Sequence, residues 1–120
     1  MFTGLHAILH TKEPERLREF FRDVLEWNHV DAGGGWLIFA APPAELAMHP
    51  TNGQTHTQLY LMCDDLDATV AKLKAKGIAC APVSTQRWGR LTSIRLPDDS
   101  ELGLYQPQHP TAIVSPRPAG

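Results

Sequence analysis

The sequence predicts an α+β fold built from two βαβββ modules, residues 1–50 and 56–107. Three observations predict it. The order of strand-like and helix-like segments in residues 5–49 starts again at residue 56. The modules end on similar phrases, ELAM at residues 45–48 and ELGL at residues 101–104. The chain has 120 residues, the length of one ordinary domain.

The first module begins with a strand and a helix. Residues 5–11 form a short apolar segment with two histidines, and we predict a strand there. Residues 13–25 carry apolar side chains at helical spacing, and Pro14 lies near the start, where a missing N–H costs little. Three shorter strands are predicted to follow, at residues 27–30, 36–41 and 45–49.

The second module repeats this order. Residues 56–62 are predicted as a strand, and Asp64 and Asp65 are placed to cap a helix. That helix is expected to bury Leu66, Val70 and Leu73 and to end at Gly77. Three strands are predicted after it, at residues 78–83, 91–96 and 101–105. Residues 108–120 are rich in proline, and we expect an extended or poorly ordered tail.

Composition excludes several classes of function. The formal net charge of −2 gives no basic footprint for nucleic acid. The apolar runs are too short to span a membrane, and the N-terminus lacks the pattern of a signal peptide. Cys63 and Cys80 have no metal-site spacing and are expected to be reduced thiols. We therefore expect a cytoplasmic protein that binds neither nucleic acid nor membrane.

Several phrases of the chain resemble the vicinal oxygen chelate superfamily, which contains glyoxalases, bleomycin-resistance proteins and extradiol dioxygenases. They are LHAIL at 5–9, FFRDVL at 20–25, CDDLDA at 63–68, KG at 76–77, LPDD at 96–99 and ELGLYQP at 101–107. The resemblance implies a curved, half-barrel-like mixed sheet with helices on its outer face. It also implies a homodimer, with the two modules paired either within one chain or across two copies.

In that superfamily a divalent metal is usually held by His or Gln on the first strand of each module and Glu on the last. Carried over by position, these places fall on His6, Gln58, Gly103 and either Leu46 or Ala47. Neither of the last two places has a carboxylate, and two neutral ligands rarely hold a divalent cation tightly. The resemblance therefore implies a degenerate site, for which Ni, Zn, Mn or Fe is the candidate metal and no cofactor is certain.

Glu101 is the candidate that could rescue this site. Because strand side chains alternate, it shares a face with Gly103 and Tyr105, and Gly103 leaves room for a displaced metal. Glu101 would then be a ligand or a general base. The alternative is that Glu101 begins an edge strand and stays solvated.

Aromatic and apolar side chains suggest a ligand pocket beside these residues. Tyr60, Met62 and Tyr105 are expected to line one cavity with His6 and Gln58, and Trp88 is expected to cover its mouth. Aromatic side chains around a few polar groups suit a flat organic ligand. The alternative for each of them is an ordinary place in the core.

Two functions compete. The first is a binding protein with a degenerate metal site that sequesters an aromatic or drug-like molecule, as the bleomycin-resistance branch does. The second is a divalent-metal-dependent lyase, isomerase or extradiol-type dioxygenase that acts on a substrate with vicinal oxygens, with His6 and Gln58 as ligands. Catalysis without metal by Glu101 or Tyr105 is a third alternative, which no residue pattern favours.

Overall fold

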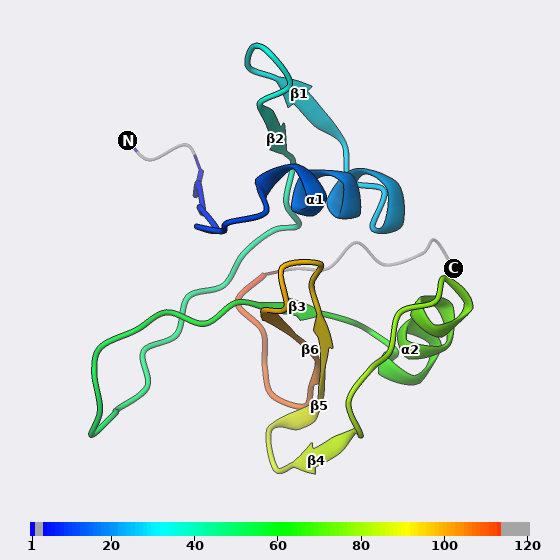
Figure 1. Ribbon diagram of the computed structural model, residues 1–120. Coiled ribbons are helices and arrows are strands. Elements are labelled where there is room, and N and C mark those ends of the chain that lie inside the picture. The colour runs from blue at the N-terminus through cyan, green and yellow to red at the C-terminus, as the bar shows by residue number, and fades with distance from the viewer. Residues whose placement is uncertain (2–3, 114–120) are drawn as a thin grey trace, which may run out of the picture.

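The computed structural model describes residues 1 and 4–113 and contains two helical segments and two sheets (Figure 1). Residues 114–120 of the predicted tail lie outside the described residues. The first half contains α1 (Pro14–Glu19), η1 (Phe20–Val24), β1 (His29–Asp31) and β2 (Leu37–Phe39). The second half contains β3 (Tyr60–Met62), α2 (Leu66–Ala75), β4 (Ser84–Gln86), β5 (Gly89–Arg95) and β6 (Glu101–Pro107).

The second half is a four-stranded sheet in the order β3-β6-β5-β4. Strand β3 runs parallel to β6, whereas β5 is antiparallel to both β6 and β4. One face of this sheet packs on α2, because the buried side chains of the strands and the helix form one core: Leu66, Leu73, Ile94, Leu102 and Leu104. The residues between them on the strands therefore face the opposite side of the sheet.

Helix α2 forms where its capping residues predict it. The Asp65 carboxylate accepts a hydrogen bond from the Ala68 backbone N–H at 3.1 Å, as expected for an N-cap. The Gln106 side chain adds a second cap, since its Oε1 accepts the Leu66 N–H at 2.8 Å. Gly77 follows the helix with a φ of +81°, the left-handed conformation that glycine adopts readily.

The first predicted helix is formed in two parts. Residues Pro14–Glu19 are α-helical, and Phe20–Val24 widen into a π-helical turn that the Leu25 N–H closes on the Phe20 carbonyl at 3.1 Å. The wider turn buries both Phe20 and Phe21, and the Phe21 ring meets Trp27 at 5.0 Å. This helical segment therefore presents its aromatic side chains to the shared core.

The β1–β2 hairpin is held by its turn. The Asp31 carboxylate accepts the Gly33 N–H at 2.8 Å and the Gly35 N–H at 3.2 Å, which ties down the predicted glycine loop. Strands at residues 27–30 and 36–41 were predicted here, and the structure has β1 and β2 within one or two residues of these ranges.

The predictions of strands at residues 5–11 and 45–49 are wrong for the described chain, because neither segment pairs with a neighbouring strand. A strand needs partners for its backbone N–H and C=O groups, and local apolar pattern alone does not provide them. Residues 78–83 likewise contribute one isolated bridge, between Cys80 and Ile94, in place of a strand. The two sheets therefore remain separate and do not close into a barrel (Figure 1).

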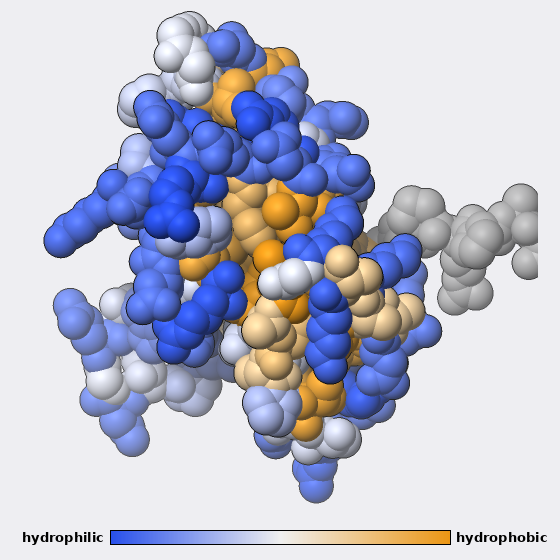
Figure 2. Space-filling view, turned by 45° about the vertical axis from the view of Figure 1, so that its right-hand side comes forward, coloured by the Kyte–Doolittle hydropathy of each residue, from blue (hydrophilic) through white to orange (hydrophobic). Residues whose placement is uncertain are grey.

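The two halves meet through a common core and through several polar contacts. Leu17, Phe20 and Phe21 pack in the same cluster as the side chains of the second half. Lys76 Nζ donates to the Val24 carbonyl at 2.7 Å, and Thr11 Oγ1 donates to Asp98 Oδ2 at 2.7 Å. Figure 2 shows apolar side chains in a hollow between the two parts, with polar side chains around it.

No helix in residues 1 and 4–113 has the length and apolar character needed to cross a membrane.

Candidate functional site

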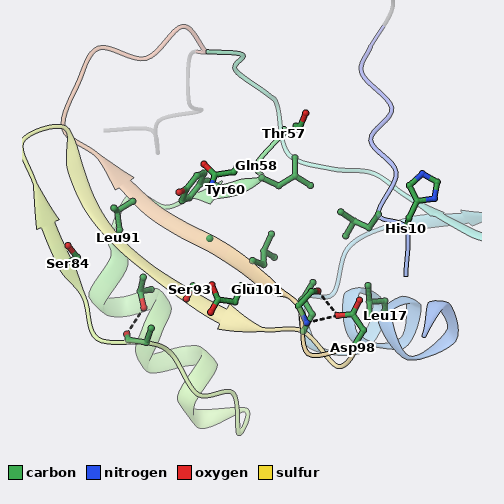
Figure 3. Close-up of a pocket in the computed structure, with 18 of the residues that line it drawn as sticks. His10, Leu17, Thr57, Gln58, Tyr60, Ser84, Leu91, Ser93, Asp98 and Glu101 are labelled. Carbon is green, nitrogen blue, oxygen red and sulfur yellow. Dashed lines mark hydrogen bonds between the residues drawn. The ribbon is translucent and has the colours of Figure 1, made fainter. Parts of the chain in front are cut away.

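A hollow lies over the four-stranded sheet and extends to the N-terminal segment. Its volume is about 590 Å³. Its walls come from residues 8–10, the approach to β3 at residues 57–60, strand β5 and the start of β6 (Figure 3). A volume of this size is typical of pockets for drug-sized molecules. We therefore treat this hollow as the candidate site and call it the sheet cavity.

The floor of the sheet cavity is set by Tyr60 and Gly103. These residues are paired in the parallel β3–β6 register, so their side chains share a face. A Cβ atom on residue 103 would collide with Cδ1 and Cε1 of Tyr60, so the ring lies directly on the glycine. The room that we expected Gly103 to leave is therefore filled by the Tyr60 ring.

A row of aromatic rings continues from Tyr60 along the sheet. Tyr60 and Tyr105 meet edge to face at 5.7 Å, and Trp88, in the turn between β4 and β5, meets Tyr105 at 5.9 Å. His109 stacks on Tyr105 at 6.0 Å, and its Nε2 lies 3.2 Å from the Tyr105 hydroxyl. Sequence reasoning missed His109, because its position in a proline-rich segment gave no signal of this contact.

Tyr105 is the centre of this row. Its hydroxyl stays neutral and can donate or accept a hydrogen bond. Burial raises the pKa of Tyr105, and the nearby Glu45 carboxylate raises it further. Glu45 also accepts backbone hydrogen bonds from Ala112 and Ile113. Glu45 therefore holds the segment that follows β6.

Two carboxylates lie in the wall of the sheet cavity. Glu101 is exposed, and its Oε1 lies 4.0 Å from Arg95 Nη2. Asp98 accepts hydrogen bonds from the Ser100 hydroxyl, the Ser100 backbone N–H and the Thr11 hydroxyl. The Ser100 and Thr11 hydrogen bonds hold the pKa of Asp98 below its usual value, so this carboxylate is ionised at neutral pH.

The structure brings together four of the predicted site residues. Gln58, Tyr60, Glu101 and Gly103 all line the sheet cavity. His6 does not line it; this residue is exposed on the N-terminal segment, and His10 reaches the wall instead (Figure 3). Met62, Trp88 and Tyr105 lie outside the lining. Met62 pairs with Tyr105 in the β3–β6 register. Tyr105 contacts the ring of Tyr60, which lines the cavity, and Trp88 contacts Tyr105.

The donor atoms do not fit a divalent metal. A catalytic zinc-type site uses three or more protein ligands, and the positions matched to the superfamily carry one imidazole, one carboxamide and no carboxylate. Within residues 1 and 4–113 there is also no group of three or more His, Cys, Asp or Glu side chains placed to hold a metal ion. Glu101 lies two residues before Gly103, the position matched to the missing ligand, and the Tyr60 ring covers that glycine.

The two thiols offer no reactive group for this site. Cys63 and Cys80 are free and half-buried, in agreement with the expectation of reduced cysteines. Burial raises the pKa of both thiols, which keeps them protonated and weakly nucleophilic.

Comparison with known proteins finds no matching family model and no matching curated protein. Among solved structures, the chain is similar to the antibiotic-binding protein TnmS3 from Streptomyces sp. CB03234, with a TM-score of 0.60 and 26% identity over 87% of this chain and 100% of that one. A glyoxalase/bleomycin resistance protein from the same organism matches with a TM-score of 0.56 and 25% identity, covering 80% and 93% of the two chains.

Lactoylglutathione lyase from Agrobacterium tumefaciens has a similar fold, with a TM-score of 0.60 and 16% identity over 87% of this chain and 92% of that one. These structures have the fold that the phrases of the sequence imply. The chain therefore has the fold of the glyoxalase and bleomycin-resistance proteins of the vicinal oxygen chelate superfamily.

Proposed function

We propose that this protein binds and sequesters a small aromatic or drug-like organic molecule in the sheet cavity, without a metal. The contact between Tyr60 and Gly103 carries the proposal. At the position where the superfamily usually has a carboxylate ligand, this chain has a glycine, and an aromatic ring lies on it. This position therefore presents the flat apolar surface of a ring to the cavity. A metal site would need a charged oxygen there.

The composition of the cavity supports this function. The Tyr60 ring and the side chains of Ile8 and Leu91 give apolar area, and burial of apolar area is the main source of affinity for an organic ligand. Gln58 and Ser93 add a carboxamide and a hydroxyl that can orient the ligand through hydrogen bonds. Aromatic contacts add about 0.5–1.5 kcal/mol to the burial of area.

The similarity to TnmS3 also supports it. That protein is described as an antibiotic binding protein, and its identity of 26% extends over nearly all of this chain. We take a molecule of antibiotic size and aromatic character as the ligand class for the present chain.

A homodimer is part of this proposal. Leu5, Ile8, Leu46 and Met48 are 65–81% exposed, whereas Leu102 and Leu104, the counterparts of Leu46 and Met48 in the second module, are 4% and 2% exposed. The radius of gyration is 15.5 Å, larger than the value of about 13.6 Å expected for a compact domain of this length. A second copy that pairs with residues 5–10 and 45–49 would bury this surface and close the open side of the cavity.

The alternative is a divalent-metal-dependent lyase, isomerase or extradiol-type dioxygenase. It would require His6, Gln58 and Glu101 around one cation, with Glu101 as ligand or base. The fold shared with lactoylglutathione lyase is compatible with this chemistry, but the donor set described above is not.

A thermal-shift screen tests the proposed function. Purified protein is heated with a panel of aromatic compounds and antibiotics, and a ligand that binds the folded state raises the melting temperature by an amount that grows with the ratio of its concentration to its Kd. We expect a rise with at least one aromatic member, and the same rise after treatment with EDTA. If only Ni, Zn, Mn or Fe raises the melting temperature, and no organic compound does, the metal-dependent alternative replaces this proposal.

A further inference from the structure

The ionisable side chains that line the sheet cavity are acidic, with one histidine as the exception. Among the described residues that line it, Asp98 and Glu101 are acidic, none is lysine or arginine, and His10 is the one titratable base. The lining therefore has two carboxylates and no ammonium or guanidinium group to offset them. An anionic ligand would be repelled by this wall, and a cationic ligand would be attracted.

Arg95 is the cation that lies beside this wall, and it does not cancel the charge. Its Nη1 donates to the Asp99 carbonyl at 2.8 Å and to Asp99 Oδ1 at 3.1 Å. The contact of Arg95 with Glu101 is longer, at 4.0 Å. The single positive charge of Arg95 is therefore shared between the carboxylates of Asp99 and Glu101. Asp98 is a third carboxylate, and its hydrogen-bond donors are neutral hydroxyl and amide groups.

The aromatic floor provides a second attraction for a cation. Tyr60 is 40% exposed, so one part of its ring faces the cavity while another part covers Gly103. Aromatic faces attract cations through the ring quadrupole. Glu101 lies two residues before Gly103 on the same face of β6, so its Cα is roughly 7 Å from the place that the ring covers. Both side chains line the sheet cavity, and Figure 3 shows Tyr60 beside Gln58 and Glu101 beside Ser93.

We infer that the ligand of the sheet cavity is a flat aromatic molecule that bears a protonated amine or a quaternary ammonium group, with its ring against Tyr60 and its cation beside Glu101. The inference rests on the proposed binding function and narrows its ligand class. Anionic ligands, such as carboxylates and phosphonates, are disfavoured by the same wall.

Three dyes with one ring system test the inference. At about pH 8, 9-aminoacridine is a cation, acridine is neutral and acridine-9-carboxylate is an anion. Fluorescence titration measures the dissociation constant of each with the wild-type protein and with the variants Glu101→Gln, Asp98→Asn and Glu15→Gln. Glu15 is an exposed acid on α1 outside the cavity lining, so Glu15→Gln changes the net charge equally and serves as the matched control.

We expect the affinity for the cation to be at least about tenfold higher than the affinity for the anion, and the affinity for acridine to lie between the two. The Glu101→Gln change should weaken binding of the cation by about threefold to tenfold and leave acridine unchanged, as expected for the loss of one nearby charge. Added salt should weaken binding of the cation and not of acridine. The Glu15→Gln variant should behave as wild type.

Equal binding of all three dyes, or tighter binding of the carboxylate, would overturn the inferred charge while the binding function stands. An unchanged preference in Glu101→Gln and Asp98→Asn would also overturn it. If none of the dyes binds, the charge of the ligands found in the thermal-shift panel decides the question, and anionic hits count against the inference. A panel without any hit would instead contradict the binding function itself.

Discussion

The ring of Tyr60 covers Gly103 so closely that a Cβ atom on residue 103 would collide with Cδ1 of the ring. This contact joins the edge strand β3 to the central strand β6, and it decides what the cavity floor is made of. An aromatic ring occupies the position at which the superfamily places a metal-binding carboxylate. The chemistry proposed for the chain depends on this pair.

The Gly103→Ala change should destabilise the protein. The new methyl group cannot fit beside the Tyr60 ring, so the ring or the strand must move, and such overpacking typically costs about 1–3 kcal/mol. Urea unfolding measures the change. Gly4→Ala is the control, because a Cβ at residue 4 meets no atom within 4 Å. In the double variant Tyr60→Ala with Gly103→Ala the clash is absent, so the loss of unfolding free energy should be smaller than the sum of the losses in the two single variants. Losses that add exactly would contradict the contact.

The Gln106→Ala change should destabilise helix α2. The Gln106 side chain accepts the Leu66 N–H at 2.8 Å, and removal of the acceptor leaves a half-buried donor without this partner. We expect a loss of about 1 kcal/mol in the free energy of unfolding. Gln108→Ala, at an exposed position two residues later, should have little effect. If Gln106→Ala and Gln108→Ala lower the free energy of unfolding equally, the hydrogen bond of Gln106 to the helix N-terminus does not contribute to stability.

The stability of the protein should fall in acid partly because of Asp98. Its folded-state pKa lies below the ordinary value of 3.8, so the unfolded chain binds a proton more readily than the folded one. The stabilisation is therefore present above about pH 4 and is lost as the pH falls through the depressed folded pKa. Asp98→Asn should flatten this part of the stability curve, measured by urea unfolding at a series of pH values.

Asp23 and Asp67 also have lowered pKa values, since they are paired with Arg22 and Arg90. The Asp98→Asn variant should therefore keep part of the acid dependence. A variant with the wild-type slope throughout the acid range would contradict the contribution of Asp98.

The exposed apolar side chains of the first module should be buried by a second copy. Light scattering after size-exclusion chromatography should give twice the chain mass of 13.3 kDa. The double change Leu46→Ser with Met48→Ser should shift the protein towards the monomer, because it removes apolar surface from the segment that we expect to pair. A wild-type protein that stays monomeric at high concentration would contradict the homodimer.

Local signals in the sequence predicted much of the second half. Asp65 and Gly77 delimit α2, and the alternation of residues 101–105 predicts that Glu101, Gly103 and Tyr105 share one face of β6. The resemblance of the phrases to a known superfamily predicted the fold, and the solved structures confirm it. These features depend on contacts within a few residues or on a pattern that one chain contains by itself.

The contacts that the sequence did not predict are between distant residues. The Tyr60 ring reaches Gly103 only because β3 pairs with β6 in one register, and no local pattern encodes that register. The hydrogen bond from Leu66 to Gln106 and the stacking of His109 on Tyr105 likewise follow from the packed fold. Residues 5–11 have a strand-like pattern but no strand beside them, so their conformation depends on a partner that the pattern does not specify.

The most direct test of the central claim, a metal-free cavity with an aromatic floor, is calorimetric titration of a ligand identified by the thermal-shift panel. It is carried out in EDTA with the wild-type protein and with Tyr60→Phe and Tyr60→Ala. We predict that EDTA leaves the affinity unchanged, that Tyr60→Phe retains it, and that Tyr60→Ala loses about fivefold to tenfold, as expected for the loss of an aromatic contact. Binding that requires an added divalent metal, or that is unaffected by Tyr60→Ala, would contradict it.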